Sequence, residues 1–289
     1  MHTTAAKPAG GTPMVLAGAS LWGVIGLFNR TLMAAGLAPE TIVLVRNLGG
    51  LVLLGLVLAV WKRGVFRVAP RHLAYFFGTG VVSVLLFTWC YFSCQQECSL
   101  AVAAILLYTS PAFVVVLSAL LWREKLTGRK LLALGLTFFG CVCVTGVYTG
   151  GMTITPKGFL LGLGAGFFYA LYSVFGRYAL VHYGPYTVTF YTFAFAGAGS
   201  LIFLKPEQVA LLADWRLVLV ALGLVVVSTV LPYLLYTAGL ARMDSGKAAI
   251  IAAVEPVVAA LMGCCLGEQI GPFTWVGVAA ILSAVLLLH

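Results

Sequence analysis

Two ionisable side chains stand inside long apolar runs of this chain. Arg46 lies within TIVLVRNLGGLVLL, and Glu255 lies within AAIIAAVEPVVAALM. A charge in such surroundings must face a cavity or a partner that offsets its lost hydration, so both residues are candidate functional groups. Two uses are open for Arg46: its guanidinium attracts an anionic group of a solute, such as a carboxylate, or it pairs with Glu255 or caps backbone carbonyls.

Glu255 also has two open chemical uses. Protonated, it could carry a proton for antiport; ionised, it could hold an ammonium group or Arg46. Pro256 follows it directly, and Pro111 stands in a similar apolar run. Proline lacks an amide hydrogen and clashes with the preceding turn, so each frees the carbonyl four residues earlier. Both prolines are therefore candidate hinges or binding walls, with a static kink as the alternative.

Aromatic side chains are numerous inside the apolar runs. Rings with a polar edge suit a cavity that holds a partly apolar or cationic small molecule. Packing between helices and anchoring at a membrane interface are the alternatives for each ring. The candidates for substrate contact are Trp22, Trp89, Tyr91, Tyr108, Tyr169, Tyr191 and Tyr236.

The sequence carries no signature of an enzyme or of a resident metal ion. The patterns HExxH and GxSxG and a phosphate loop ending in GK[ST] are absent. Cys90, Cys94 and Cys98 follow one another at intervals of four residues without a histidine nearby, which favours small apolar packing. A disulfide between Cys94 and Cys98 stays open. We predict no catalytic residue, no cofactor and no metal site.

The elements that must position these groups are helices that cross a membrane. Of the 289 residues, 62% are hydrophobic and 9% are charged, whereas charged residues make up about a quarter of a soluble domain. Continuous apolar runs of the roughly 20 residues needed to cross a hydrocarbon core recur along the chain, unlike the short alternating segments of a strand barrel. We predict an all-α integral membrane protein with ten spans, near residues 14–35, 41–61, 72–92, 99–121, 129–147, 158–180, 186–204, 215–240, 246–266 and 272–288.

Basic residues are distributed unevenly between the two ends of these predicted spans. One side holds most of the lysines and arginines, whereas the other holds Arg30, Lys157, Lys205 and Arg216. This positive-inside asymmetry predicts a multi-pass protein of the inner (plasma) membrane with both termini in the cytoplasm. It also accounts for the net charge of +9 without nucleic-acid binding.

The two halves of the chain repeat one another. The segment VVSVLLFTWCYF matches VVSTVLPYLLYT at an offset of 145, which places Ser83 on Ser228 and Pro111 on Pro256. Each half contains five predicted spans, and because five is odd the second copy must lie upside down relative to the first. The sequence therefore predicts two inverted five-helix repeats, over residues 14–147 and 158–288.

The repeat also ranks the candidates. Trp22 falls on Tyr169, and Tyr91 falls on Tyr236, so these pairs rank highest among the aromatic residues. Ser110 occupies the place that matches Glu255. The proline break thus obeys the symmetry, while the carboxylate violates it.

Two segments, AAILLYTSPAFVVVLSALLWREKLT and AAIIAAVEPVVAALMGCCLGEQI, resemble the two copies of the EamA domain in the drug/metabolite transporter superfamily. The resemblance covers nearly the whole chain, and its most specific parts are the proline-centred helices that end in Arg123-Glu124 and Gly267-Glu268. It implies a ten-helix carrier in which four helices of each half surround a central cavity and the fifth and tenth pack at the back. The first helix lacks the embedded glutamate of the related four-helix multidrug carriers, which weakens proton exchange by their mechanism.

The function that the resemblance implies is export of a small metabolite, such as an amino acid, by alternating access. Uptake or exchange of an organic cation, a nucleobase or a drug is the alternative within transport. A membrane enzyme or a lipid-handling protein is the alternative from another class. The expected partners are a small-molecule substrate and membrane lipids, with protons as a candidate coupling ion; no nucleic acid is expected, and the oligomeric state is left open.

Overall fold

A computed structural model describes residues 10–147, 154–267 and 271–288. Within these ranges the chain is helical, and one isolated β-bridge joins Cys98 to Ile154. Nine stretches in the described part are long and apolar enough to cross a membrane, and a shorter apolar helix forms a tenth. The predicted all-α membrane fold is thus confirmed. His2, Glu268 and His289 lie outside the described residues.

The first half contributes five crossings. They consist of α1 (Gly11–Gly23) with α2 (Ile25–Ala34), α3 (Pro39–Trp61), α4 (Leu73–Phe77) with η3 (Gly78–Leu85) and α5 (Leu86–Gln95), α6 (Leu100–Leu107) with α7 (Ser110–Trp122), and α8 (Gly128–Thr145).

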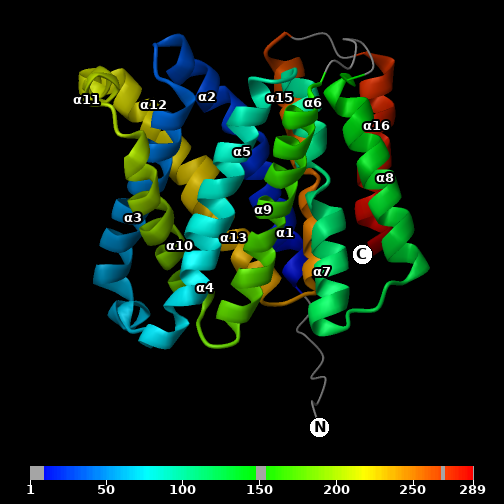
Figure 1. The fold of residues 1–289 in the computed structure, drawn as a ribbon, viewed down its shortest axis with the longest axis horizontal. Helices are drawn as coiled ribbons and strands as arrows, with labels where there is room; N and C mark the ends of the chain where they lie inside the picture. The colour runs from blue at the N-terminus through cyan, green and yellow to red at the C-terminus, as the bar shows by residue number, and fades with distance from the viewer. Residues whose placement is uncertain (1–9, 148–153, 268–270, 289) are drawn as a thin grey trace.

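The second half contributes the other five crossings. The first of them, α9, begins at the face of the bundle opposite to the one where α1 begins (Figure 1). Since α9 runs in the direction opposite to α1, the two five-helix repeats are inverted, as predicted. Their boundaries at 14–147 and 158–288 stay a prediction. The crossings are α9 (Pro156–Leu180), α10 (Pro185–Ser200), α12 (Trp215–Val225) with η7 (Val226–Val230) and α13 (Leu231–Leu240), α14 (Ser245–Ala252) with α15 (Glu255–Cys265), and α16 (Pro272–Leu288).

Local sequence sets where several helices begin. Pro39, Pro156 and Pro185 lie in the first turn of their helices, where the missing amide hydrogen would have no partner in any case. Thr127 and Thr155 cap α8 and α9, because each hydroxyl accepts a hydrogen bond from a backbone N–H of the first turn.

The helical irregularities recur in both halves. The third and eighth crossings contain π-helical segments, η3 and η7, at matching positions of the repeat. The fourth and ninth crossings are interrupted at Tyr108–Thr109 and at Ala253–Val254, which are again 145 residues apart. Interrupted helices at corresponding places of inverted repeats are typical of transporter binding sites.

These interruptions explain how Glu255 and the prolines are tolerated. Pro111 lies in the first turn of α7 and Pro256 in the first turn of α15, so neither breaks a continuous helix. Glu255 also lies in the first turn of α15, where the positive end of the helix dipole favours a carboxylate.

Two glycines let neighbouring helices touch the interrupted crossings. A Cβ atom at Gly23 of α1 would stand 2.7 Å from the Glu255 carbonyl oxygen. A Cβ atom at Gly166 of α9 would stand 2.5 Å from Thr109 Oγ1 and 2.8 Å from the Leu106 carbonyl oxygen. The close approach of α1 and α9 therefore requires residues without a side chain at these points.

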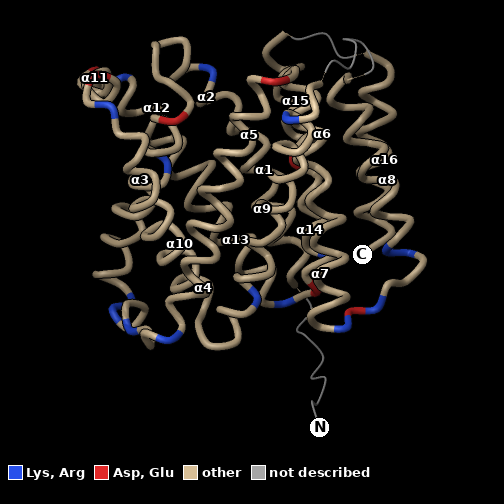
Figure 2. Tube along the Cα trace, in the orientation of Figure 1, with Lys and Arg blue, Asp and Glu red and all other residues tan. Residues whose placement is uncertain are grey.

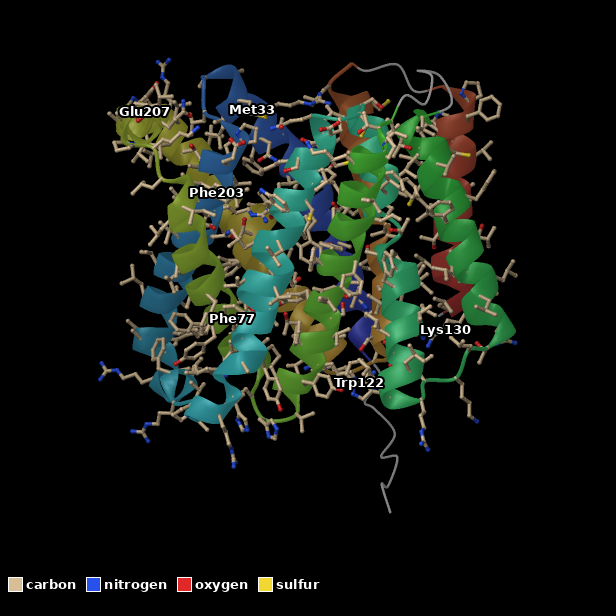
Figure 3. All side chains as sticks on the ribbon, viewed as in Figure 1. Met33, Phe77, Trp122, Lys130, Phe203 and Glu207 are labelled. Carbon is tan, nitrogen blue, oxygen red and sulfur yellow. The ribbon has the colours of Figure 1, made fainter. Side chains whose placement is uncertain are left out.

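The outside of the bundle fits a lipid environment. Large apolar side chains cover it, among them Phe77, which is 48% exposed (Figure 3). Lysine and arginine gather at the end of the bundle where α1 begins, which we call the N-terminal face (Figure 2). Helices α8 and α16 pack against each other at one side of the bundle, as the resemblance implied (Figure 1).

Candidate substrate-binding site

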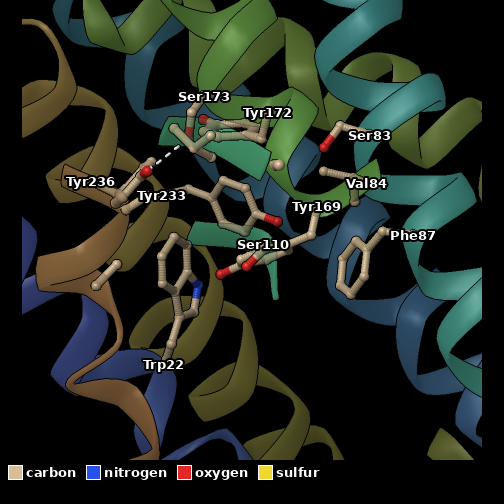
Figure 4. Close-up of a pocket in the computed structure, with 14 residues that line it drawn as sticks. Trp22, Ser83, Val84, Phe87, Ser110, Tyr169, Tyr172, Ser173, Tyr233 and Tyr236 are labelled. Carbon is tan, nitrogen blue, oxygen red and sulfur yellow. Dashed lines mark hydrogen bonds between the residues drawn. The ribbon is translucent and has the colours of Figure 1, made fainter. Parts of the chain in front are cut away.

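A cavity lies among the crossings that contain the irregular segments. It offers about 30 Å³ to the centres of water molecules, which is space for roughly two waters. The cavity is therefore small in this conformation. Its polar and aromatic lining consists of Trp22 of α1, Ser83 of η3, Phe87 of α5, Ser110 of α7, Tyr169, Tyr172 and Ser173 of α9, and Tyr233 and Tyr236 of α13 (Figure 4).

Packed aromatic rings form one wall of the cavity. The Trp22 ring lies 5.2 Å from the Tyr233 ring in an edge-to-face arrangement and 5.4 Å from the Tyr236 ring. The Tyr172 ring lies 5.2 Å from the Tyr233 ring, also edge to face. This wall joins α1, α9 and α13, so it contains parts of both repeats.

Two hydrogen bonds tie α9 to α13 beside the cavity. Tyr172 Oη lies 2.6 Å from Thr237 Oγ1, and Ser173 Oγ lies 2.7 Å from Tyr236 Oη (Figure 4). These buried hydroxyls satisfy one another, so they serve the contact between helices rather than a ligand in this conformation.

The two embedded ionisable groups do not form an ion pair, and neither is among the residues that line the cavity. Within the described residues, Arg46 of α3 and Glu255 of α15 are not within ion-pair distance, although they interact electrostatically. Arg46 Nε is buried without a hydrogen-bond partner. Both charges act electrostatically on Tyr169 and Tyr233, which line the cavity. The structure thus holds two ionisable groups inside membrane-spanning helices; both act electrostatically on residues of the cavity lining, and neither contacts the other directly.

The predicted aromatic candidates divide into those at the cavity and those apart from it. Trp22, Tyr169 and Tyr236 line it. Tyr108 lies at the interruption between α6 and α7, and Tyr91 lies on α5. Glu255 interacts electrostatically with both of these side chains.

Two aromatic candidates lie elsewhere. Trp89 of α5 is 52% exposed on the outside of the bundle and does not line the cavity. Tyr191 of α10 donates a hydrogen bond to the Phe66 carbonyl oxygen at 2.9 Å, and its ring stacks on Phe76 at 4.9 Å. The positions favour a lipid-facing ring for Trp89 and a packing contact for Tyr191.

Several lining residues were missing from the sequence-based candidates. Tyr172 follows Tyr169 by three residues, which places both on one helix face, so the helical period could have indicated it. Ser83 was visible as half of the matched pair with Ser228, but serine in an apolar helix gives no signal of its own. Ser110 was visible as the counterpart of Glu255.

Charged residues at the N-terminal face tie the two repeats together. Glu124, which follows α7, accepts hydrogen bonds from Arg177 of α9, from Lys130 of α8 at 3.1 Å and from the Ser245 amide at 3.1 Å. The Glu124 side chain is only 5% exposed. Burial alone raises the pKa of this carboxyl, but Lys130 and Arg177 outweigh burial and hold the pKa below its usual value. The Arg177 guanidinium also lies 4.4 Å from the Trp122 ring.

The opposite face carries a more exposed tie between the repeats. Glu97 accepts hydrogen bonds from Lys157 Nζ at 2.7 Å and from Thr155 Oγ1 at 2.8 Å. The Lys157 hydrogen bond lowers the pKa of Glu97. Because solvent screens exposed pairs, this tie is weaker than the buried one around Glu124.

The cysteines are free thiols. Cys94 Sγ lies 3.5 Å from Cys98 Sγ, so the disulfide that the sequence left open is not formed. Within the described residues no group of three or more His, Cys, Asp or Glu side chains is arranged to hold a metal ion.

A model of the EamA-like transporter family matches residues 10–146 and again residues 156–289. An uncharacterized transporter of Archaeoglobus fulgidus is 32% identical over 199 residues, which cover 68% of this chain and 70% of that protein. The threonine/homoserine exporter RhtA of Escherichia coli is 30% identical over 131 residues, or 44% of this chain and 43% of RhtA. A solved structure shares the fold with a TM-score of 0.78 at 19% identity, covering 96% of this chain and 95% of the other.

Proposed function

Because the chain belongs to the EamA-like transporter family, we propose that it exports a small zwitterionic metabolite, an amino acid or a related compound, by alternating access. The similarity to a threonine/homoserine exporter supports this choice of substrate and direction. Following the positive-inside rule, the proposal assigns the N-terminal face and both termini to the cytoplasmic side of an inner membrane.

The observation that carries the proposal is the pair of ionisable side chains inside the helices, Arg46 and Glu255, which both act electrostatically on Tyr169 and Tyr233 of the cavity lining. Arg46 suits a substrate carboxylate, because a guanidinium offers several donors in a plane that matches a carboxylate. Glu255 suits a substrate ammonium group. An amino acid would supply both partners at once and would offset the cost of holding two opposite charges apart in an apolar setting.

The predicted aromatic residues of the lining complete the recognition that we propose. Trp22, Tyr169 and Tyr236 present ring faces and edges to a small solute, and ring faces also attract a cationic group. Trp89, Tyr91, Tyr108 and Tyr191, which do not line this cavity, would contact a solute only along a route of entry or exit.

Alternating access requires the cavity to open toward one face at a time. The interruptions before Pro111 and Pro256 provide two places, one in each repeat, where half-helices can change angle without losing internal hydrogen bonds. The buried contacts of Glu124 hold the N-terminal face together in this conformation. Opening toward that face would separate Glu124 from Arg177.

Glu255 has a second role in this proposal if transport is coupled to protons. A carboxylate that holds the substrate ammonium in one step would take up a proton after the substrate leaves, which prevents an unpaired buried charge. Proton antiport would then drive export.

Transport by purified protein in liposomes tests the proposal. Liposomes are loaded with a panel of radiolabelled amino acids and with an organic cation and a nucleobase, and efflux is measured with and without a pH gradient. We expect saturable efflux of amino acids that a pH gradient accelerates. If the organic cation or the nucleobase shows saturable efflux and no amino acid does, the proposed substrate class is wrong. If the rate of amino-acid efflux is the same with and without the pH gradient, transport is not coupled to protons.

A further inference from the structure

Ser83 contributes to the cavity lining a fully buried hydroxyl that forms no hydrogen bond within the protein. Ser83 of η3 is 1% exposed, and its Oγ atom has no hydrogen-bond partner. It lines the cavity, and its oxygen points inward from the wall across from Tyr236 (Figure 4). A buried hydroxyl without a partner costs free energy of folding, so its presence requires an explanation.

The matched serine of the other repeat shows what a structural serine does at this place. Ser228 of η7 is also fully buried, but its hydroxyl donates a hydrogen bond to the Leu21 carbonyl oxygen of α1 at 3.0 Å. That bond ties η7 to α1. Ser83 makes no corresponding hydrogen bond to α9. The two repeats therefore have serine at the same position, but only Ser228 uses its hydroxyl to join two helices.

The other polar groups near Ser83 are engaged or lie in the same lining. Tyr172, Ser173 and Tyr236 hydrogen-bond within the contact between α9 and α13. Ser110 lines the same cavity at the start of α7. Ser83 therefore has few protein groups to satisfy it while the cavity keeps this shape.

We infer that Ser83 determines specificity by hydrogen-bonding a hydroxyl group on the short side chain of the transported amino acid. This inference rests on the proposed function, in which Arg46 and Glu255 hold the carboxylate and the ammonium group. The π-helical geometry of η3 places Ser83 on the lining, and π-helical turns often occur at functional sites.

The chemical consequence is discrimination between substrates of the same shape. A site that hydrogen-bonds a substrate hydroxyl rejects an analogue without it, because the protein hydroxyl then stays buried and unpaired. Threonine and valine have nearly the same shape and differ in this one group, which makes them suitable probes.

The experiment compares threonine and valine as competitors of labelled-threonine exchange in liposomes that contain the parent protein, Ser83→Ala or Ser228→Ala. We expect the parent to prefer threonine, Ser83→Ala to lower the threonine-to-valine affinity ratio by about tenfold, and Ser228→Ala to leave the ratio unchanged. Thermal unfolding of each purified variant shows whether it is folded before exchange is measured.

The outcomes separate the two proposals. A parent that does not distinguish the probes, an unchanged ratio in Ser83→Ala, or an equal change in Ser228→Ala overturns the role of Ser83 and leaves the proposed function standing. If the parent binds neither probe nor any other amino acid, both the proposed function and this inference are overturned.

Discussion

Arg177 of α9 forms an ion pair with the buried carboxylate of Glu124, which follows α7, and so joins the two inverted repeats at the N-terminal face. Lys130 and the Ser245 amide complete the surroundings of the same carboxylate. A carboxylate with three such donors is well satisfied despite its burial. In the proposed transport cycle, this contact must separate when the cavity opens toward the N-terminal face.

Replacing Glu124 by Gln should destabilise the protein in a pH-dependent way. Removing one partner of a buried ion pair leaves the cations uncompensated, which costs about 3 kcal/mol or more. Because the pKa of Glu124 is lowered in the folded protein, its contribution is fully present above the ordinary value of 4.5 and is lost as pH falls through the lowered pKa. The difference in Tm between parent and Glu124→Gln should therefore be largest near neutral pH and narrow below pH 4.5.

The matched control for this prediction is Glu97→Gln at the opposite face. Glu97 also pairs with a lysine across the repeats, but Lys157 is largely exposed, so its loss should change Tm much less. Equal losses of Tm in the two variants at neutral pH would contradict the view that the buried tie is the stronger one.

Replacing Gly166 by Ala should test the close packing of α9 on the interrupted fourth crossing. The new methyl group would overlap Thr109 Oγ1 and the Leu106 carbonyl oxygen, and overpacking of this kind costs about 1–3 kcal/mol. In Gly164→Ala the nearest atom is Cys90 Sγ at 3.4 Å, an ordinary contact. Thermal unfolding should show a Tm below that of the parent for Gly166→Ala and an unchanged Tm for Gly164→Ala. If both variants have the Tm of the parent, α9 does not pack as closely on the fourth crossing as described.

Replacing Pro111 or Pro256 by Ala should impair the movement of the half-helices. Alanine restores an amide hydrogen, which favours a continuous helix across the interruption. We expect the maximal transport rate to fall more than the apparent affinity for substrate, as for a change in a conformational step. If both variants transport at the parent rate, the prolines are static kinks.

The sequence predicted the fold well because the governing signals are local. Ten apolar runs, a basic face and a repeat with an odd number of spans suffice for two inverted bundles. The matched prolines also predicted where the fourth and ninth crossings are interrupted. The π-helical segments η3 and η7 were not predicted, because their residues are ordinary apolar helix residues.

The site was harder to predict than the fold, since it depends on which side of each helix faces inward. Hydrophobicity does not distinguish a lipid-facing ring from a cavity-facing ring, so only the repeat ranked Trp22, which lines the cavity, above Trp89, which is exposed. Small polar residues such as Ser83 carry too little signal in an apolar run. Arg46 and Glu255 were evident because charge inside a span is rare.

Transport of substrate analogues by the parent, Arg46→Gln and Glu255→Gln tests the central claim most directly. The analogues are an amino acid, its carboxamide, which lacks the carboxylate, and its desamino acid, which lacks the ammonium group. We predict that the parent prefers the zwitterion, that Arg46→Gln loses its preference over the carboxamide, and that Glu255→Gln loses its preference over the desamino acid. If both variants keep the parent's full preference for the zwitterion, Arg46 and Glu255 do not bind the substrate and the account is contradicted.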